Sequence, residues 1–498
     1  MAFAITRIGF LMVFDKEASF EEAVITVLKQ HGWNDAEGVL RYPTEQDLID
    51  NWAKILFNNN AGIDRLNGCP LTQGEMAQVI EQIETLKTPL ALNGFINGKT
   101  VAITRDNPND ALHLGKEISL KIYDRQEIAA GQSRYQIAQQ PVYPAKSKIL
   151  NDRRGDLCLL INGMPVIHIE LKRSGVPVSQ ATGQIEKYAH EGVFTGLFRL
   201  VQIFVGLTPD EARYFANPGA GAFNPNFFFH WEDFNNELVC AGDKPGTDEW
   251  KRFTSTLLSI PMAHQLIGFY TVADSSDGCL KVMRSYQYYA AAAISDKVRR
   301  CKWDEPRHSS TPGRPGGYIW HTTGSGKTMT SFKSAQLIAD SHDADKVVFL
   351  MDRIELGIQS LSEYRSFADD ADDVQGTENT QVLKSKLASD DPKNRLIVTS
   401  IQKMSNVKAG EARITQAELD RLAAKRIVFI IDECHRSTFG DMLQDIRRAF
   451  PNALFFGFTG TPILDENQKK GSTTAMVFGE CLHRYSIADG IRDGNVLG

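Results

Sequence analysis

Residues 321–328 read HTTGSGKT, a Gly-rich stretch that combines small residues, a lysine and hydroxyl side chains. Gly324 and Gly326 have no Cβ atom, so the backbone N–H groups of such a loop can converge on the oxygens of a triphosphate. Lys327 can place its charge on the outer phosphates, and the hydroxyl of Thr328 can ligate Mg²⁺. The stretch therefore predicts an ATP site with these binding residues: Gln287, Thr323, Gly324, Ser325, Gly326, Lys327 and Thr328.

Two more motifs with chemical potential follow apolar runs further along the chain. The run IVFII leads into DECH, where Asp432 can hold the Mg²⁺ and Glu433 can orient and deprotonate the attacking water. A later run ends in Thr459, Gly460 and Thr461, and hydroxyls at this place could sense hydrolysis and relay it to DNA contacts. Both motifs agree with nucleotide hydrolysis at the Gly-rich loop.

Two positions refine the class of nucleotide site. The general phosphate-loop pattern begins with glycine, whereas this chain has His321, a departure that helicase-type loops tolerate. Upstream, the amide of Gln287 could hydrogen-bond an adenine edge. These features favour a helicase-like ATP site.

A second group of chemically competent residues is Asp156, Glu170 and Lys172, in the pattern D-x13-E-x-K. Two β-rich runs flank Asn162-Gly163, a strong signal for a hairpin turn. Two carboxylates that converge across a hairpin can bind Mg²⁺, which can polarise a scissile phosphate, and the lysine can stabilise the developing charge. We therefore predict a metal site made by Asp156 and Glu170, with Lys172 beside it.

The register of this hairpin sets a condition on the metal site. A two-residue Asn162-Gly163 turn pairs Ile161 with Met164, which places Asp156 on the face opposite Glu170. The two carboxylates can meet if a three-residue loop or a β-bulge shifts the register by one residue. We predict such a distortion.

Residues on two helices are expected to support this site. Gln184 and Tyr188 lie at i and i+4 on one helix face, and QIEKY resembles the QxxxY element of some PD-(D/E)xK nucleases. That resemblance also implies an acidic residue from an early helix, for which Glu21 is the first candidate and Glu22 the second. Gly155 stands where the family's name implies proline, a tolerable departure because the carboxylate is the metal ligand.

The elements that must position these residues differ between the two parts of the chain. An amphipathic helix is expected over 19–31, and the hairpin is followed by a helix over about 177–190 and a strand over 200–207. After about residue 310, short apolar runs alternate with helix-like segments, which predicts a parallel sheet covered by helices on both faces. The expected strands are 318–320, 346–351, 395–400, 426–432 and 453–460.

The composition limits the classes of protein to which the chain can belong. The 498 residues exceed one ordinary domain, and 42% hydrophobic residues allow large cores. The net charge of −6 argues against a protein that coats nucleic acid with positive charge over its whole surface, but not against a local basic groove that binds nucleic acid.

The seven cysteines have no CxxC spacing, so neither a zinc ribbon nor a disulfide framework is indicated, and a reducing compartment suits them. Without an apolar run long enough for a membrane span, we expect a cytoplasmic protein.

GSGKT, DECH and TGTP, in this order, resemble the motifs of superfamily 2 helicase and translocase motors. The segments 351–359 and 398–404 look like the DNA-tracking motifs of that superfamily. The resemblance implies a RecA-like lobe whose ATP site is completed by arginine fingers from a second lobe. The sequence stops at Gly498, before a second lobe could fit, so we expect it to be part of a longer protein, with weak or absent ATP turnover alone.

The whole order, a nuclease-like hairpin with QIEKY followed by a DECH motor, resembles the restriction (HsdR) subunit of type I restriction–modification enzymes. The closing segment, VFGECLHRYSIADGIRDGNVLG, also resembles that family's passage between two motor lobes. The resemblance implies an α/β protein with a PD-(D/E)xK endonuclease domain, 1–260, a first RecA-like lobe of superfamily 2 type, 261–480, and the start of a connection to a second lobe, 481–498.

The family resemblance also implies an activity and partners. It implies a type I site-specific deoxyribonuclease that translocates double-stranded DNA with ATP and cleaves it with Mg²⁺ away from the recognition site. It implies a complex with methyltransferase (HsdM) and specificity (HsdS) subunits, and S-adenosylmethionine would act through these partners.

Two other readings remain open from the sequence. A stand-alone DNA repair helicase–nuclease would process DNA ends without methyltransferase subunits. An ATP-gated DNA-binding or scaffold protein with a dead nuclease site is disfavoured by the intact Asp156, Glu170 and Lys172. A type III restriction subunit is disfavoured because its nuclease follows the motor.

Overall fold

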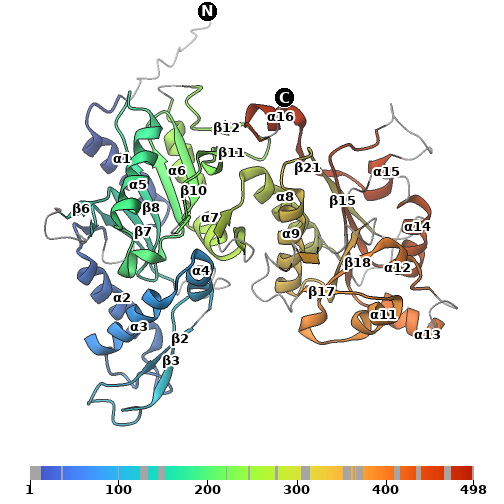
Figure 1. The fold of residues 1–498 in the computed structure, drawn as a ribbon, viewed down its shortest axis with the longest axis horizontal. Coiled ribbons are helices and arrows are strands. Elements are labelled where there is room, and N and C mark those ends of the chain that lie inside the picture. The colour runs from blue at the N-terminus through green and yellow to red at the C-terminus, as the bar shows by residue number, and fades with distance from the viewer. Residues whose placement is uncertain are drawn as a thin grey trace, which may run out of the picture. The chain divides into compact units, whose positions relative to one another are not determined.

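The computed structural model describes two compact α/β units (Figure 1), each of which carries one of the predicted chemical sites. The first unit extends to Val282 and the second begins at Met283, except that the short segments Asp233–Glu237 and Asp274–Ser276 are grouped with the second unit. This division lies later in the chain than the boundary expected after residue 260. The described residues are 13–34, 38–98, 100–123, 133–143, 152–219, 221–244, 247–274, 279–303, 314–351, 361–362, 365, 374–408, 415–432, 434, 439–464 and 473–495.

A six-stranded mixed sheet forms the centre of the first unit, in the order β1-β4-β7-β8-β9-β10. Its central strands β7 and β8 form an antiparallel hairpin, and β8 pairs in parallel with β9 through the crossover helix α5. The strands are β1 (Leu40–Arg41), β4 (Tyr135–Gln139), β7 (Leu157–Ile161), β8 (Met164–Leu171), β9 (Ile203–Leu207) and β10 (Ala212–Ala216).

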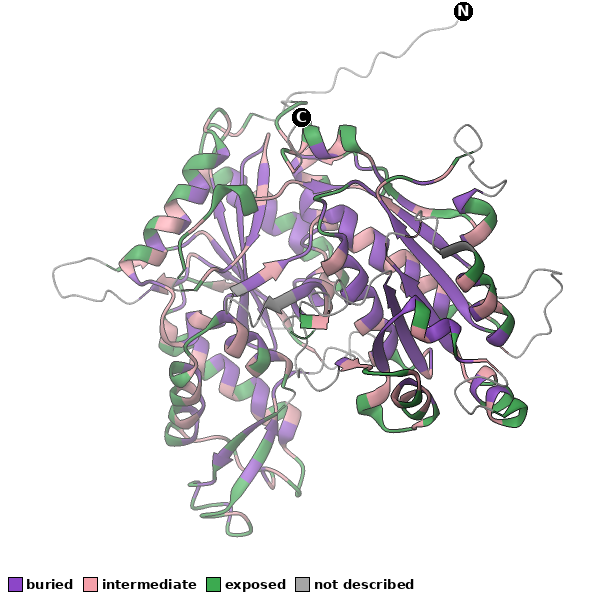
Figure 2. Cartoon of the chain, turned by 45° about the vertical axis from the view of Figure 1, so that its right-hand side comes forward, coloured by how far each residue is buried: buried purple, intermediate pink, exposed green. Residues whose placement is uncertain are grey.

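Every residue of β7 and β8 is buried, so the hairpin lies inside the unit (Figure 2). Helices α1 and α5 pack against β8. The helices of this unit are α1 (Glu17–Gln30), α2 (Glu45–Asn60), α3 (Gln73–Thr85), α4 (Pro89–Asn97), α5 (Val178–Glu191), α6 (Glu249–Thr256) and α7 (Ile260–Gln265). Its short two-stranded pairs are β2 (Thr100–Thr104) with β3 (Glu117–Lys121), β5 (Val142–Tyr143) with β6 (Arg153–Arg154), β11 (Trp231–Glu232) with β12 (Leu238–Val239), and β13 (Thr271–Asp274) with β14 (Cys279–Val282).

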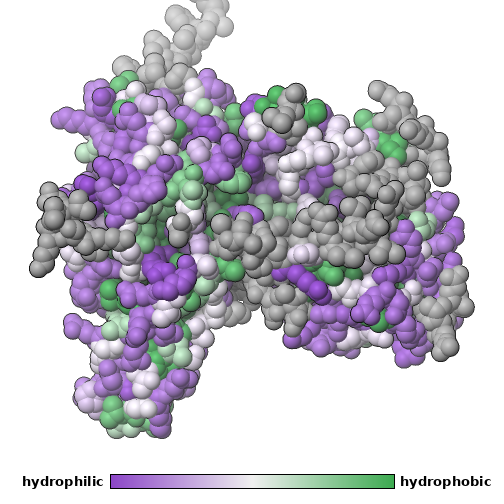
Figure 3. Space-filling model, viewed as in Figure 1, coloured by the Kyte–Doolittle hydropathy of each residue, from purple (hydrophilic) through white to green (hydrophobic). Residues whose placement is uncertain are grey.

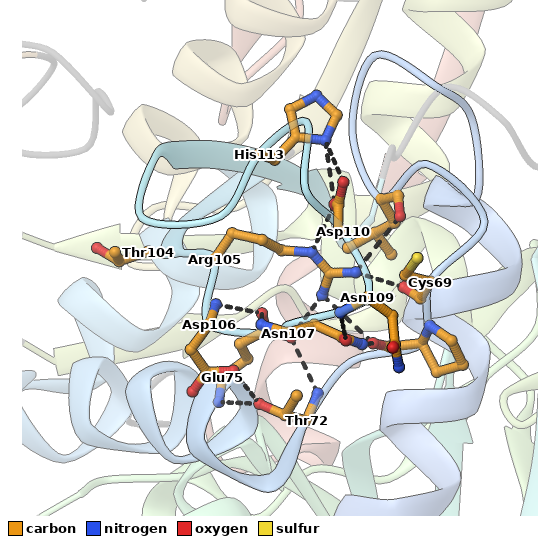
Figure 4. Close-up of polar contacts among 12 residues, drawn as sticks. Cys69, Thr72, Glu75, Thr104, Arg105, Asp106, Asn107, Asn109, Asp110 and His113 are labelled. Carbon is orange, nitrogen blue, oxygen red and sulfur yellow. Dashed lines mark hydrogen bonds and ion pairs between the residues drawn. The ribbon is translucent and has the colours of Figure 1, made fainter.

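The loop between β2 and β3 is held by a buried ion-pair network around Arg105 (Figure 4). The guanidinium of Arg105 bonds Glu75 Oε2 at 2.6 Å and Asp110 Oδ2 at 2.9 Å, and all three side chains are inaccessible to solvent. Glu75 also accepts from the backbone of the same loop and caps α3. The network fixes a loop whose exposed apolar side chains, Leu112 and Leu114, belong to the end of this ribbon, where Figure 3 shows apolar atoms at the surface.

The second unit is built on a seven-stranded sheet in the order β17-β18-β16-β19-β20-β15-β21, in which all neighbouring strands are parallel. Val348 and Leu350 of β16 pack into one apolar cluster, and Val347 and Phe349 into another, as expected for a sheet buried on both faces. The strands are β15 (Arg314–His321), β16 (Lys346–Met351), β17 (Val374–Gly376), β18 (Leu396–Ser400), β19 (Ile427–Ile431), β20 (Leu454–Thr459) and β21 (Cys481–Tyr485). The helices are α8 (Ser285–Arg299), α9 (Lys327–Ser341), α11 (Thr380–Ala388), α12 (Ile401–Ser405), α13 (Gln416–Ala423), α14 (Phe439–Ala449), α15 (Thr474–Phe478) and α16 (Ile487–Arg492).

The parallel sheet and its five expected strands are confirmed, while two strands were not expected. β17 is three residues long and follows a segment without a clear pattern. β21 lies in the range assigned to a connection, 481–498, yet it pairs with β15 along the edge of the sheet. Its sequence CLHRY has exposed and half-buried positions, as suits an edge strand, and therefore gives a weak apolar signal.

Among the described residues, none of the helices combines the length and the apolar character that a membrane crossing requires.

We predict that Arg105→Ala opens the β2–β3 ribbon. The substitution leaves the carboxylates of Glu75 and Asp110 buried without their cation, which costs about 3–5 kcal/mol. Hydrogen–deuterium exchange of the β2 and β3 amides measures the loss as a lower free energy of opening. Lys116→Ala, which removes an exposed charge from the same loop, is the control and should change this free energy by less than about 0.5 kcal/mol. Equal protection in the two variants would show that the network is dispensable.

The network also predicts a pH dependence. Burial raises the pKa of Asp110, but hydrogen bonds from Arg105, His113 and Asn67 outweigh it and lower the pKa from 3.8 to about 2. A lowered pKa in the folded state means that the charge of Asp110 stabilises the fold above pH 3.8, and that this contribution is lost as the pH falls towards about 2. The opening free energies of wild type and Asp110→Asn should thus differ most near neutral pH and converge in acid. A difference that stays constant down to this pH would contradict the assignment.

Candidate functional site

The β7–β8 hairpin contains the distortion that the sequence predicted. Asn162 and Gly163 form a two-residue turn with φ values of 51° and 85°, the left-handed pattern that tight hairpins favour. Ile161 pairs with Met164 and Leu160 with Pro165, but Leu159 pairs with Ile167. The extra residue is Val166, so the prediction of a bulge is confirmed. Beyond it the register is shifted by one, and Leu157 pairs with Ile169.

The bulge brings Asp156 and Glu170 to the same side of the hairpin. Extending the shifted register by one residue places Asp156 opposite Glu170, so the two side chains lie on the same face of the hairpin. Asp156 Oδ2 also accepts the backbone N–H of Leu171 at 2.6 Å. Lys172 Nζ lies 3.2 Å from Glu170 Oε1, so the three residues of the D-x13-E-x-K pattern form one cluster.

Burial controls the charge of this cluster. Glu170 is fully buried, and burial raises its pKa to about 7 although the charge of Lys172 and hydrogen bonds from Lys172 and Asp156 act in the opposite direction. Burial and the neighbouring Glu170 carboxylate raise the pKa of Asp156 well above its usual value. Burial alone would lower the pKa of Lys172, but the carboxylates of Glu170, Asp156 and Glu17 raise it. The pair of carboxyl groups is therefore stabilised by a proton or by a cation.

The donor set fits Mg²⁺. Two carboxylates with water completing the coordination are a common way for proteins to hold this ion. Glu170 Oε2 is a buried oxygen without a hydrogen-bond partner among the described residues, so this carboxylate has unused capacity as an acceptor. Within the described part of the chain, no group of three or more His, Cys, Asp or Glu side chains is placed to hold a metal ion.

Gln184 and Tyr188 lie beside this cluster on α5. Gln184 Nε2 donates to Tyr188 Oη at 2.6 Å, and Tyr188 Oη donates to the backbone oxygen of Arg154 at 2.7 Å. Burial, followed by the charge of Glu170, raises the pKa of Tyr188, so this hydroxyl stays protonated. The pair ties α5 to the chain just before Asp156, which is consistent with a supporting role.

The early helix α1 contributes two carboxylates with different surroundings. Glu21 is buried and accepts hydrogen bonds from the amides of Gln139 at 2.7 Å and Gln140 at 3.0 Å, and burial raises its pKa. The backbone N–H of Gln140 in turn donates to the backbone carbonyl oxygen of Asp156. Glu17, one turn earlier, lies 3.4 Å from Lys172 Nζ. Glu21 thus reaches the cluster through Gln140, whereas Glu17 contacts it directly.

The predicted phosphate loop follows β15 and leads into α9. Gly324 and Gly326 have φ values of 83° and 74°, a left-handed backbone that glycine adopts without strain. A Cβ atom on Gly326 would lie 2.7 Å from Gln287 Nε2, so the position also lacks space. Lys327 and Thr328 begin α9, whose first N–H groups have no partners within the helix and point towards the loop.

Gln287 contacts the phosphate loop itself. Its Nε2 donates to the backbone oxygens of Ser325 at 3.2 Å and Gly326 at 3.4 Å, and its Oε1 accepts from the backbone of Arg284. Tyr286 Oη also donates to the oxygen of Ser325 at 2.9 Å. The amide therefore supports the loop, and its contact with an adenine edge stays a prediction.

Asp432 and the segment from Thr459 to Thr461 lie at the same edge of the sheet as the phosphate loop, because they follow the carboxyl ends of parallel strands. β20 lies between β15 and β19 in the sheet. Its last residue, Thr459, therefore lies between the phosphate loop, which follows β15, and Asp432, which follows β19. A Cβ atom on Gly460 would lie 3.2 Å from Thr323 Oγ1, which shows how closely the two loops pack. Thr461 donates its backbone N–H to Thr459 Oγ1 at 3.1 Å.

Glu433 and residues 352–359 of the expected DNA-tracking segment lie outside the described residues.

Sequence reasoning missed three residues that the structure places at these sites. Glu17 was passed over because the helix was expected to begin at Ser19, although it begins at Glu17. His168 was given no role from the sequence, yet its Nε2 lies 3.5 Å from Glu170 Oε2. Tyr286, adjacent to Gln287, was not considered. The alternation of side chains along β8 could have identified His168, because it is two residues from Glu170.

Two family models match separate parts of the chain. Residues 15–222 match the family model described as type I restriction enzyme R protein N terminus, and residues 286–498 match that of the SWI2/SNF2 ATPase.

Individual proteins are similar along the chain. An endonuclease subunit of a type I restriction enzyme from Staphylococcus saprophyticus is 36% identical over 98% of this chain, which spans 47% of that protein. A putative C-terminal part of such a subunit from Mycoplasma pneumoniae is 42% identical over 35% of this chain and is covered over 82% of its own length. A fragment structure of a putative HsdR subunit from Vibrio vulnificus is 18% identical, with a TM-score of 0.29, over 72% of this chain and 56% of its own. The chain thus spans about half the length of the first of these relatives.

We predict that Gly326→Ala weakens ATP binding. The added Cβ meets Gln287 Nε2, and the left-handed backbone is unfavourable for alanine by about 1 kcal/mol or more. A fluorescent ATP analogue should bind about 5-fold or more weakly, since 1.4 kcal/mol corresponds to a factor of 10. Gly183→Ala is the control, because a Cβ there meets nothing within 4 Å and its φ is not left-handed. Undiminished binding by Gly326→Ala would contradict the described loop geometry.

Proposed function

The chain belongs to the family of type I restriction enzyme endonuclease subunits, and from this premise we propose that it carries both the DNA-cleaving site and part of the DNA-translocating motor of such an enzyme. The first unit would cut DNA with Mg²⁺ at Asp156 and Glu170. The second unit would bind ATP with Mg²⁺ at the loop that ends in Lys327. The first unit would cleave double-stranded DNA, and the second unit would move it.

One observation carries the nuclease half of the proposal. The bulge at Val166 brings the carboxylates of Asp156 and Glu170 together at the end of a buried hairpin, where Lys172 lies beside Glu170. Burying these charges is costly unless they are paired or bind an ion. A structural role needs no such arrangement, whereas phosphodiester cleavage needs a cation and a positive side chain beside it.

The side chains of the cluster then have distinct parts to perform. Asp156 and Glu170 would hold Mg²⁺, which supplies Lewis acidity to the scissile phosphate and lowers the pKa of its attacking water. Lys172 Nζ, held by Glu170 and Glu17, would stabilise negative charge on the phosphate. Gln184 and Tyr188 would fix the backbone at Arg154 next to Asp156.

The second unit would couple ATP hydrolysis to movement along DNA. Lys327 would bind the outer phosphates, Thr328 and Asp432 would ligate the nucleotide's Mg²⁺, and Glu433 would orient the attacking water. The close packing of Gly460 on Thr323 gives a direct path from the phosphate loop to the TGTP segment. Movement of the phosphate loop would therefore shift Thr459, Gly460 and Thr461 and the DNA contacts that follow them.

The complete enzyme would need further subunits. We propose a complex with methyltransferase (HsdM) and specificity (HsdS) subunits, which would bind S-adenosylmethionine and recognise the DNA sequence. Cleavage away from the recognition site follows if translocation by the motor delivers distant DNA to the Asp156 cluster. A cytoplasmic location agrees with a DNA substrate.

The experiment compares Lys327→Ala and Asp156→Ala in the full-length subunit assembled with its partners. Both variants should lose DNA cleavage, but Lys327→Ala should also lose ATP turnover, because these residues serve separate phosphate chemistries. Cleavage of circular DNA and phosphate release from ATP are the two measurements. The controls are Asp64→Ala and Lys393→Ala, which remove exposed charges from the same two units.

Two outcomes would contradict the proposal. Continued ATP hydrolysis by Lys327→Ala would remove the motor assignment, and Mg²⁺-dependent cleavage by Asp156→Ala would remove the nuclease assignment.

A further inference from the structure

The nuclease cluster rests on a buried Tyr–His pair. His168 lies on β8 two residues before Glu170, so both side chains point to the same face of the sheet. It is fully buried, and Tyr143 of β5, also fully buried, places its hydroxyl 2.9 Å from His168 Nδ1. The other imidazole nitrogen, Nε2, lies 3.5 Å from Glu170 Oε2.

The hydrogen-bonding needs of these groups define the tautomer. A buried phenol keeps its proton and requires an acceptor, and burial raises the pKa of Tyr143 well above its usual value. Among the described residues, the acceptor in reach of this hydroxyl is His168 Nδ1. With Nδ1 as acceptor, the ring proton of His168 is on Nε2, the nitrogen that faces Glu170.

Both atoms of this last contact lack other partners. His168 Nε2 and Glu170 Oε2 are buried polar atoms without a hydrogen bond in the described structure. Their separation of 3.5 Å is longer than a good hydrogen bond, so a small movement of the carboxylate would complete it. Glu170 is thus approached by Lys172 at Oε1 and by His168 at Oε2.

The residue before Asp156 makes room for this pair. A Cβ atom on Gly155 would lie 2.7 Å from His168 Cε1 and 2.7 Å from Tyr143 Oη. The glycine that replaces the family's proline is therefore required by the Tyr143–His168 contact. Phe194 and Phe204 enclose the ring of His168 on other sides, with centroids at 5.4 and 6.1 Å.

We propose that His168, held by Tyr143 with its proton on Nε2, is a positioning residue that donates to Glu170 and orients its carboxylate for the nuclease cation. Residues that hydrogen-bond to a metal's ligands commonly orient those ligands, and their loss weakens metal binding about 10–100-fold. The inference rests on the proposed nuclease function and adds a residue that the D-x13-E-x-K and QxxxY patterns do not contain.

The test measures Mn²⁺ binding to the intact, nucleotide-free chain by the loss of the free-ion EPR signal. The variants are His168→Gln, whose amide nitrogen can replace Nε2 as donor, and His168→Asn, whose shorter amide falls near Nδ1. His168→Asn should bind Mn²⁺ at least about 10-fold more weakly, and His168→Gln should retain most of the affinity. Tyr143→Phe should also weaken Mn²⁺ binding, because the Tyr143 hydroxyl then no longer donates to His168 Nδ1 and the proton of the imidazole is no longer held on Nε2.

Controls separate orientation from packing. Phe204→Leu alters a ring contact with the same imidazole but no hydrogen bond, and should leave Mn²⁺ affinity unchanged. DNA cleavage by the complete enzyme should follow the same order, with His168→Gln rescuing most of the activity that His168→Asn loses. Equal losses in His168→Gln, His168→Asn and Phe204→Leu, or full affinity in His168→Asn, would overturn the proposal.

Asp156→Ala distinguishes this inference from the proposed function. If Asp156→Ala abolishes Mn²⁺ binding while His168→Asn does not weaken it, the positioning role alone fails. If Asp156→Ala keeps full Mn²⁺ affinity, the nuclease metal site itself fails and the inference with it.

Discussion

One extra residue in a buried hairpin decides whether the first unit has a metal site. Val166 of β8 has no partner residue in β7. The resulting shift in register turns Asp156 and Glu170 to the same face of the hairpin. Without the bulge, one of two carboxylates would face the opposite side of a strand pair that is buried throughout. The proximity of the two carboxylates follows from this register. Their raised pKa values follow chiefly from burial, and Lys172 lies near Glu170 because the two residues are two positions apart in the chain.

Both candidate sites depend on glycines that make room for polar contacts. Gly155 leaves space for Tyr143 and His168 under the carboxylates, and Gly326 leaves space for Gln287 under the phosphate loop. In each case a buried amide or imidazole supports the groups that would bind an ion or a phosphate. The two units therefore share one arrangement. In each, an apolar sheet is the rigid framework, and a buried polar side chain contacts the segment that carries the candidate site.

The sequence predicted the parallel sheet and the hairpin well, because strong apolar runs and the Asn162-Gly163 turn are local signals. It also required a bulge, since the carboxylates could not otherwise meet. It could not locate Val166, because a bulge depends on pairing across the hairpin. The buried partners of Arg105 were missed for a similar reason: Glu75 is 30 residues away and is joined to it by the fold alone.

The most direct measurement is anomalous X-ray diffraction from crystals of the chain soaked in Mn²⁺. We expect an anomalous peak that contacts one oxygen of Asp156 and one of Glu170, with Lys172 adjacent and Val166 bulged. Carboxylates on opposite faces of an undistorted hairpin, or no peak at them when Mn²⁺ is bound elsewhere in the crystal, would contradict the account.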